Sequence, residues 1–195
     1  MKTPRIVLAS TSVYRKSLLE RLGLSIECIA PGVDEKEFKQ RFNDPHQIAN
    51  RLARAKSEAV FRENPDAIVI GGDQIATIDG TLMDKPGTEE NAARQLQALS
   101  AQTHELITAV CILSPGHKPM EHLDISRLAM RPLNKETIQR YIRLDMPLQC
   151  AGSYKIESAG IALFDRIETA DHTAITGLPL IWVVSALQSI GISVP

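Results

Sequence analysis

The chain has 195 residues, of which 44% are hydrophobic and 23% are charged, so it is long and apolar enough to fold around a core. Its formal net charge of −1 excludes a general attraction to nucleic acid or to a membrane surface. The three cysteines, Cys28, Cys111 and Cys150, form no close pair and no zinc spacing, which indicates a reducing compartment. The apolar run of the first ten residues is too short for a signal peptide, and the longest apolar stretch, 178–187, is too short to span a bilayer.

The first predicted elements alternate between strand and helix. Residues 6–9 form a strand, and Ser12 is placed to cap a helix whose apolar residues follow a helical period. A second strand covers 26–30. Asp44 and Pro45 then begin a long helix, because Asp caps a helix and Pro suits its first turn.

A third strand is predicted at 67–70, and two glycines follow it. We expect Gly71 and Gly72 to let the chain leave the sheet and to let another backbone or a ligand come close. Asp73 then lies just past the carboxyl end of a central strand, which is where open α/β sheets bind ligands. The alternative is that Asp73 only caps a turn.

The second half of the chain has hairpins as well as helices. Its signals are a turn at 79–80 between strands 75–78 and 81–83, a helix capped by Thr88, strands at 104–113 and 122–130, a helix opened by Asn134, and a buried helix after Pro179. Alternating elements with some hairpins predict an α/β fold, in which helices flank a mixed twisted sheet.

The sequence ASTSVYRK at 9–16 is a candidate anion site. Small hydroxyl residues such as Ser10 at a strand-to-helix turn leave backbone N–H groups exposed, and a helix N-terminus attracts phosphate. Arg15 and Lys16 add positive charge, and an arginine grips phosphate with two hydrogen bonds. The alternative is a solvated first turn.

Three further charged clusters are weak signals by themselves. After the second strand, Asp34 and Glu35 are adjacent, so they point in different directions and one of them could hold a divalent metal. On the long helix, Arg54 and Lys56 do not share a face, so Lys56 could point inward while Arg54 faces water. Lys85 follows the hairpin, whose turn folds it back toward the preceding acid. Taken alone, each cluster is better explained as a solvated surface.

The stretch CAGSYKIES at 150–158 combines small, aromatic and charged residues. Tyr154 offers a stacking face, and Lys155 and Glu157 supply opposite charges, although an irregular strand with an exposed face is the alternative. The phosphate-binding, dinucleotide, zinc-protease and hydrolase motifs GxxxxGK[ST], GxGxxG, HExxH and GxSxG do not occur in the chain. The five histidines are scattered, so we expect surface or capping roles for them.

Together the clusters resemble the Maf family of nucleoside triphosphate pyrophosphatases. The matching stretches occur in family order: LASTSVYRKSLLERLGL at 8–24, VDE at 33–35, RLARAKSEAV at 51–60, IGGDQIATIDG at 70–80, DKPGTEENA at 84–92, AGSYKIESAGI at 151–161 and GLPL at 177–180. The chain is most similar to the subgroup that hydrolyses 7-methyl-GTP, because Gln74 follows the acid and the CAGSYK-x-E stretch is present.

The resemblance implies a fold, a reaction and a setting. The fold would be a single domain over 1–195 with two lobes and a central cleft, as in inosine triphosphatases. The reaction would convert 7-methyl-GTP to 7-methyl-GMP and pyrophosphate, which removes modified nucleotides from the pool. It also implies a divalent metal (Mg²⁺ or Mn²⁺), a cytoplasmic location, a nucleotide as the only kind of partner besides often a second copy, and neither nucleic acid nor membrane.

The resemblance also implies roles for individual residues. The acidic base falls on Asp73, the specificity positions on Tyr14, Gln74 and Glu157, the phosphate positions on Ser10, Arg15, Lys16, Lys56 and Lys85, and the metal positions on Glu35 and Asp73. Two positions depart from the family pattern, because Lys16 lacks the planar fork of an arginine and Asp84 stands where glycine is common.

Two other functions fit parts of this sequence. One is a pyrophosphatase for dTTP and UTP, or for inosine triphosphate, on the same fold. The other is a nucleotide-binding regulator of cell division that does no chemistry, although the acids Glu35 and Asp73 favour catalysis.

Overall fold

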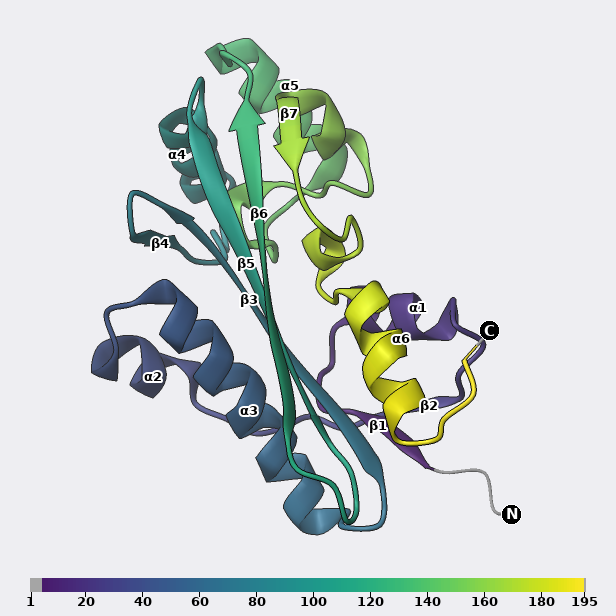
Figure 1. Cartoon of the computed structure of the whole chain (residues 1–195). Helices are drawn as coiled ribbons and strands as arrows, with labels where there is room; N and C mark the ends of the chain where they lie inside the picture. The colour runs from purple at the N-terminus through teal and green to yellow at the C-terminus, as the bar shows by residue number, and fades with distance from the viewer. Residues whose placement is uncertain (1–4, 195) are drawn as a thin grey trace. The chain divides into compact units, whose positions relative to one another are not determined.

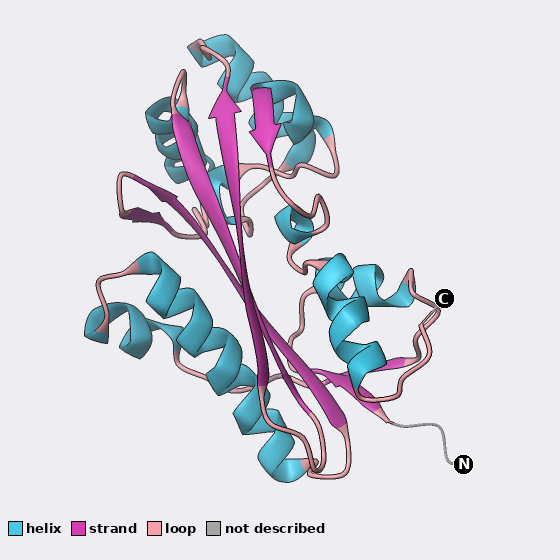
Figure 2. Cartoon of the chain, viewed as in Figure 1, coloured by secondary structure: helices cyan, strands magenta, loops and turns pink. Residues whose placement is uncertain are grey.

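The computed structural model describes residues 5–194, which divide into two compact units. The first unit takes 5–73, 108–124 and 171–194, and the second takes 74–107 and 125–170. The helices and strands are β1 Ile6–Leu8, α1 Val13–Glu20, β2 Ile26–Cys28, α2 Glu35–Arg41, α3 Pro45–Glu63, β3 Ile68–Ile78, β4 Thr81–Met83, α4 Glu89–Leu99, β5 Thr103–Leu113, β6 Met120–Met130, α5 Lys135–Asp145, β7 Phe164–Glu168 and α6 Leu180–Ser189, with short 3₁₀ helices η1 Ala151–Ser153, η2 Ala159–Leu163 and η3 Ala174–Thr176 (Figures 1 and 2).

The sheet is mixed, which confirms the predicted fold class. Its strand order is β2-β1-β3-β5-β6-β7, and β4 pairs with β3. β1 runs parallel to both β2 and β3, whereas β4 is antiparallel to β3 and β7 is antiparallel to β6. The predicted cleft between two lobes stays a prediction.

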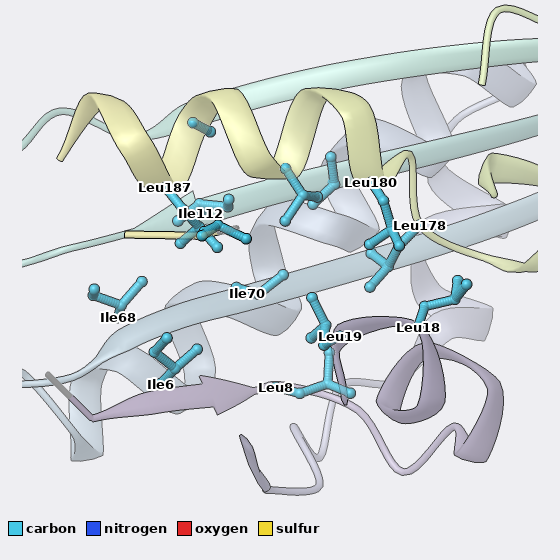
Figure 3. Close-up of a cluster of buried hydrophobic side chains, with 14 residues drawn as sticks. Ile6, Leu8, Leu18, Leu19, Ile68, Ile70, Ile112, Leu178, Leu180 and Leu187 are labelled. Atoms are coloured by element: carbon cyan, nitrogen blue, oxygen red, sulfur yellow. The ribbon is translucent and has the colours of Figure 1, made fainter. Parts of the chain in front are cut away.

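In the first unit, helices cover both faces of the parallel strands. Alternate residues of a strand point to opposite faces, and the two faces have separate hydrophobic cores. On one face, Ile6 and Leu8 of β1 and Ile68 and Ile70 of β3 pack with α1 and α6, which Figure 3 shows. On the other face, the odd-numbered residues of the same strands pack with Val60 of α3.

Helix caps explain where most helices begin. Ser12, Asp44, Thr88 and Asn134 each accept a hydrogen bond from a backbone N–H of the first turn, as their positions in the sequence predict. α6 follows Pro179 and is rich in buried apolar residues, also as predicted. Across residues 5–194, the structure contains no helix with the length and hydropathy needed to cross a membrane.

Three elements differ from the predictions. β3 runs without a break from Ile68 to Ile78, so the prediction that the chain leaves the sheet at Gly71 is wrong. The sequence predicted a charged cluster where the structure has the helix α2. The helix lacks an apolar period because none of its residues is buried. β7 was not among the predicted strands, since only Phe164 of its five residues is buried and an apolar alternation is lacking.

Candidate active site

The glycines before Asp73 permit a helix and an arginine to approach β3 closely. A Cβ atom on Gly71 would lie 2.6 Å from the carbonyl oxygen of Ala53 in α3, which no side chain tolerates. A Cβ on Gly72 would lie 3.3 Å from Nε of Arg15. The predicted close approach at these glycines is therefore confirmed, although it takes place within the strand.

Asp73 lies in the interior of β3 and not past its end. The predicted place past the end of the strand is wrong, because the two glycines lie within β3 and do not end it. Since side chains alternate along a strand, Asp73 points to the same face as Gly71, which is the face that α3 covers. Its side chain is buried, with a relative exposure of 7%.

Lys56 of α3 joins two carboxylates. Its Nζ atom donates to Oδ1 of Asp73 at 2.7 Å and to Oε1 of Glu35 at 2.6 Å. The Lys56 side chain is 8% exposed, whereas Glu35 is 45% exposed. Arg54 lies on the outer face of the helix and pairs with Glu58, so the predicted difference between Arg54 and Lys56 is confirmed.

Glu35 reaches Lys56 from the first residue of α2. The preceding Asp34 caps this helix, because its Oδ1 accepts from the Lys36 N–H at 2.9 Å. The two adjacent acids therefore point in different directions, as expected. α2 packs beside α3 (Figure 1), and this contact brings Glu35 to the ammonium.

Arg15 is held in place by two neutral oxygens. Its Nε donates to the carbonyl of Gly177 at 3.0 Å, and its Nη1 donates to Oγ of Ser10 at 3.3 Å. Thr108 holds the segment just before Gly177, since its hydroxyl donates to the Ala174 carbonyl at 2.9 Å. The predicted residues Ser10 and Arg15 thus lie together at the start of α1.

Opposite charges face one another across this cluster. Burial raises the pKa of Asp73, while Lys56 and Arg15 act in the opposite direction. Burial also lowers the pKa of the Arg15 guanidinium, and the charges of Asp73 and Glu35 oppose that change. Two cations and two carboxylates therefore balance one another around the acid of β3.

Among residues 5–194, no group of three or more histidine, cysteine or acidic side chains is arranged to hold a metal ion. The chain does offer the carboxylates of Glu35 and Asp73, which touch the same ammonium. Mg²⁺ typically takes one or two protein carboxylates and completes its shell with waters and substrate phosphates. This donor set fits a metal that is shared with a polyphosphate.

The other predicted residues occupy α1 and the second unit. Lys16 is exposed, and its ammonium lies 3.5 Å from Glu20 one helical turn away. Tyr14 is half-buried in α1. Gln74, Lys85 and Glu157 belong to the second unit: Gln74 is half-buried in β3, Lys85 is exposed after β4, and Glu157 is exposed between η1 and η2.

In the second unit, one buried and two partly buried hydrogen bonds anchor the segment that carries Glu157. Tyr154 is 5% exposed, and its hydroxyl lies 2.9 Å from Nε2 of the buried His104. The backbone N–H of Lys155 donates to the Tyr141 hydroxyl, and its ammonium donates to the carbonyl of Asp145. The expectations of an open stacking face at Tyr154 and of a surface role for His104 are therefore wrong.

Gly177 is the residue of this site that no prediction singled out. Its contribution is a backbone carbonyl to Arg15, and a backbone acceptor leaves no side-chain signature in a sequence. Its φ of 122° strongly favours glycine, and a Cβ there would make a tight contact of 3.3 Å with Cγ of Arg15. The GLPL stretch at 177–180 was the signal available.

Known proteins resemble this chain over nearly its whole length. The family model described as Maf-like protein matches residues 5–190. A 7-methyl-GTP pyrophosphatase of Bdellovibrio bacteriovorus is 43% identical over 97% of this chain and 98% of its own, and one of Xanthomonas axonopodis pv. citri is 43% identical over 98% and 100%. The Ham1 protein of Staphylococcus aureus has a similar fold, with a TM-score of 0.54 at 14% identity over 95% of this chain and 99% of its own.

Proposed function

Because the chain belongs to the family of Maf-like proteins, we propose that it hydrolyses 7-methyl-GTP to 7-methyl-GMP and pyrophosphate. The observation that carries this proposal is the buried Asp73, which shares the Lys56 ammonium with Glu35 and lies in the field of Arg15. Relatives with that activity in their names are 43% identical over almost their full length. The proposed activity belongs to the whole chain as one domain.

The chemistry is mainly charge neutralisation and positioning of water, because a triphosphate carries several negative charges. We assign the phosphates to Arg15, Lys56 and Lys85, with Ser10 and Lys16 as further donors. Gly177 and Ser10 orient Arg15, so its guanidinium needs little reorganisation.

Asp73 is the proposed general base. Its carboxylate orients a water molecule and takes its proton while the water oxygen bonds to the α-phosphorus. The bond from that phosphorus to the bridging oxygen then breaks, and pyrophosphate leaves. A raised pKa suits this role, because a base is most effective when its pKa is near the working pH.

Glu35 and Asp73 are the proposed ligands of a divalent cation, Mg²⁺ or Mn²⁺. When bound, this cation would neutralise charge on the phosphate oxygens. The support is the pair of carboxylates on one ammonium.

The proposed base specificity rests on a positive charge. A guanine methylated at N7 carries a delocalised positive charge, which prefers an aromatic face and a nearby carboxylate. We assign these roles to Tyr14 and Glu157, and hydrogen bonds to the base edge to Gln74.

Pyrophosphate release from a panel of nucleotides tests the function. We expect 7-methyl-GTP to be the best substrate among 7-methyl-GTP, GTP, dTTP, UTP and inosine triphosphate, in the presence of Mg²⁺ or Mn²⁺ and not of chelator. A preference for dTTP or UTP would contradict the assignment to the subgroup that hydrolyses 7-methyl-GTP. Nucleotide binding without turnover would favour a regulator of cell division.

The proposed setting is the cytoplasm, which agrees with the absence of a disulfide at Cys28, Cys111 and Cys150. We also propose a homodimer on the family resemblance alone. Gel filtration with light scattering measures this state directly.

A further inference from the structure

Lys56 binds both carboxylates that are assigned to the metal. We propose that, in the free protein, the Lys56 ammonium occupies the carboxylates of Glu35 and Asp73 and so prevents a metal ion from binding them. When a triphosphate binds the ammonium, the two carboxylates become available to the metal ion. Metal and nucleotide then bind interdependently. This inference rests on the proposed function.

The first argument is competition for the same oxygens. The ammonium lies 2.6 Å from Oε1 of Glu35 and 2.7 Å from Oδ1 of Asp73, which are the lengths of strong charge-assisted hydrogen bonds. A cation that binds these oxygens must replace those hydrogen bonds. Lys56 and Asp73 are both buried, so water cannot readily take over the lost contacts.

The second argument is the local balance of charge. The carboxylates of Glu35 and Asp73 are already offset by Lys56 and Arg15, whose field also acts on both acids. A divalent cation alone would leave this partly buried group with two excess positive charges, which is costly beside the buried Lys56 and Asp73. A triphosphate brings the negative charge that the additional cation requires.

The third argument identifies Lys56, and not Arg15, as the group that moves. Arg15 is fixed by hydrogen bonds to neutral oxygens of Gly177 and Ser10. The Lys56 ammonium, in contrast, donates to the two carboxylates. A lysine carries its charge on a flexible four-carbon stem, so its ammonium can turn to a phosphate without moving α3.

Mn²⁺ binding measured by electron paramagnetic resonance, without turnover, tests the exchange. Lys56→Gln keeps a hydrogen-bonding side chain but removes the charge. We expect it to bind Mn²⁺ alone at least about tenfold more tightly than the unchanged protein. The matched control is Arg54→Gln, which removes the same charge from the exposed face of the same helix and should leave the affinity unchanged.

A second measurement uses the unchanged protein and so does not depend on the variant folding. The probe is a 7-methyl-GTP analogue with a methylene group between the α- and β-phosphates. Mn²⁺ should raise the affinity of the unchanged protein for this analogue, and by linkage the analogue should raise the affinity for Mn²⁺. The coupling should shrink in Lys56→Gln.

Three results would overturn the exchange: equal Mn²⁺ affinity in Lys56→Gln and the unchanged protein, an equal gain in Arg54→Gln, or Mn²⁺ binding by the unchanged protein that is independent of the analogue. The proposed function fails by a separate result, which is the absence of pyrophosphate release from 7-methyl-GTP.

Discussion

Asp73 is buried beside two cations, so its carboxylate is both paired and poorly solvated. Asp73→Asn keeps the shape of the side chain and removes the base. We expect turnover of 7-methyl-GTP to fall at least about 100-fold, because general-base assistance typically accelerates a reaction by at least that factor. Pyrophosphate release measures the effect, and circular dichroism should show an intact fold. Asp66→Asn, at an exposed turn, is the control and should retain full turnover.

A second prediction at this scale concerns His104, where burial lowers the pKa to about 4 from the ordinary 6.5. Between these values the unfolded chain binds a proton that the folded chain does not. Stability is therefore greatest above pH 6.5 and falls as the pH drops toward about 4, by up to about 3 kcal/mol.

Urea unfolding at several pH values checks this prediction. His104→Gln cannot titrate but can still pair with the Tyr154 hydroxyl, so its stability should depend less on pH in this range. His117→Gln, on the exposed loop after β5, should behave like the unchanged protein. If the stability of His104→Gln depended on pH as much as that of the unchanged protein, groups other than His104 would cause the loss of stability at low pH.

At the scale of elements, the packing of α3 on β3 depends on Gly71. A methyl group there would lie 2.2 Å from Oγ of Ser57 and 2.6 Å from the Ala53 carbonyl, so the helix must move. We expect Gly71→Ala to lower the free energy of unfolding by about 1–3 kcal/mol, as overpacking does. Because backbone atoms cause part of the clash, adding Ser57→Ala should restore only part of the lost free energy of unfolding.

Urea denaturation measures both variants against a control on a loop. Gly32 has a φ of 63° and open space around a Cβ, and asparagine tolerates this conformation. Gly32→Asn should therefore cost much less than Gly71→Ala. Equal losses would mean that packing on α3 is not the cause.

The elements that sequence predicted well are those with local signals. Caps at Ser12, Asp44, Thr88 and Asn134 and the turn at Asp79-Gly80 act within a few residues, and the structure has each of them. The continuity of β3 could not be predicted, because the reason for a glycine at 71 lies on another element. Ser57 and Ala53 of α3 leave no room for a side chain there, so this glycine does not mark a strand end. α2 was missed since it buries none of its residues.

The same distinction applies to the candidate site. Its charged members were predictable by residue type and spacing, and the structure joins Glu35, Lys56 and Asp73. The carbonyl of Gly177 and the burial of Tyr154 arise from tertiary packing and were not predictable. The roles of Gln74, Lys85 and Glu157 stay predictions.

At the scale of the whole molecule, the two units are interleaved along the chain. Three of their four boundaries, after Asp73, Ile107 and Asp124, fall inside β3, β5 and β6, and the fourth, after Ala170, falls in the loop between β7 and η3. We expect limited proteolysis to yield no stable fragment that corresponds to either unit. Cleavage by proteinase K should begin in the exposed loop 115–119, as mass spectrometry of the products would show. A folded fragment ending near residue 73 or 107 would contradict this expectation.

The net charge of −1 describes the chain as a whole, whereas the cluster around Asp73 concentrates charge of both signs. Recognition of an anion is therefore a local property here, and long-range steering contributes little.

The two-residue repeat of β3 restricts how this region of the chain can change in evolution. Gly71 and Asp73 share the face toward α3, while Gly72 lies toward Arg15. Losing or gaining one residue between Ile70 and Asp73 would rotate the acid to the side of Arg15 and Leu178 and present a neighbouring residue to Lys56. Homologues that keep the acid should therefore tolerate length changes at the ends of this strand and not within its glycine pair.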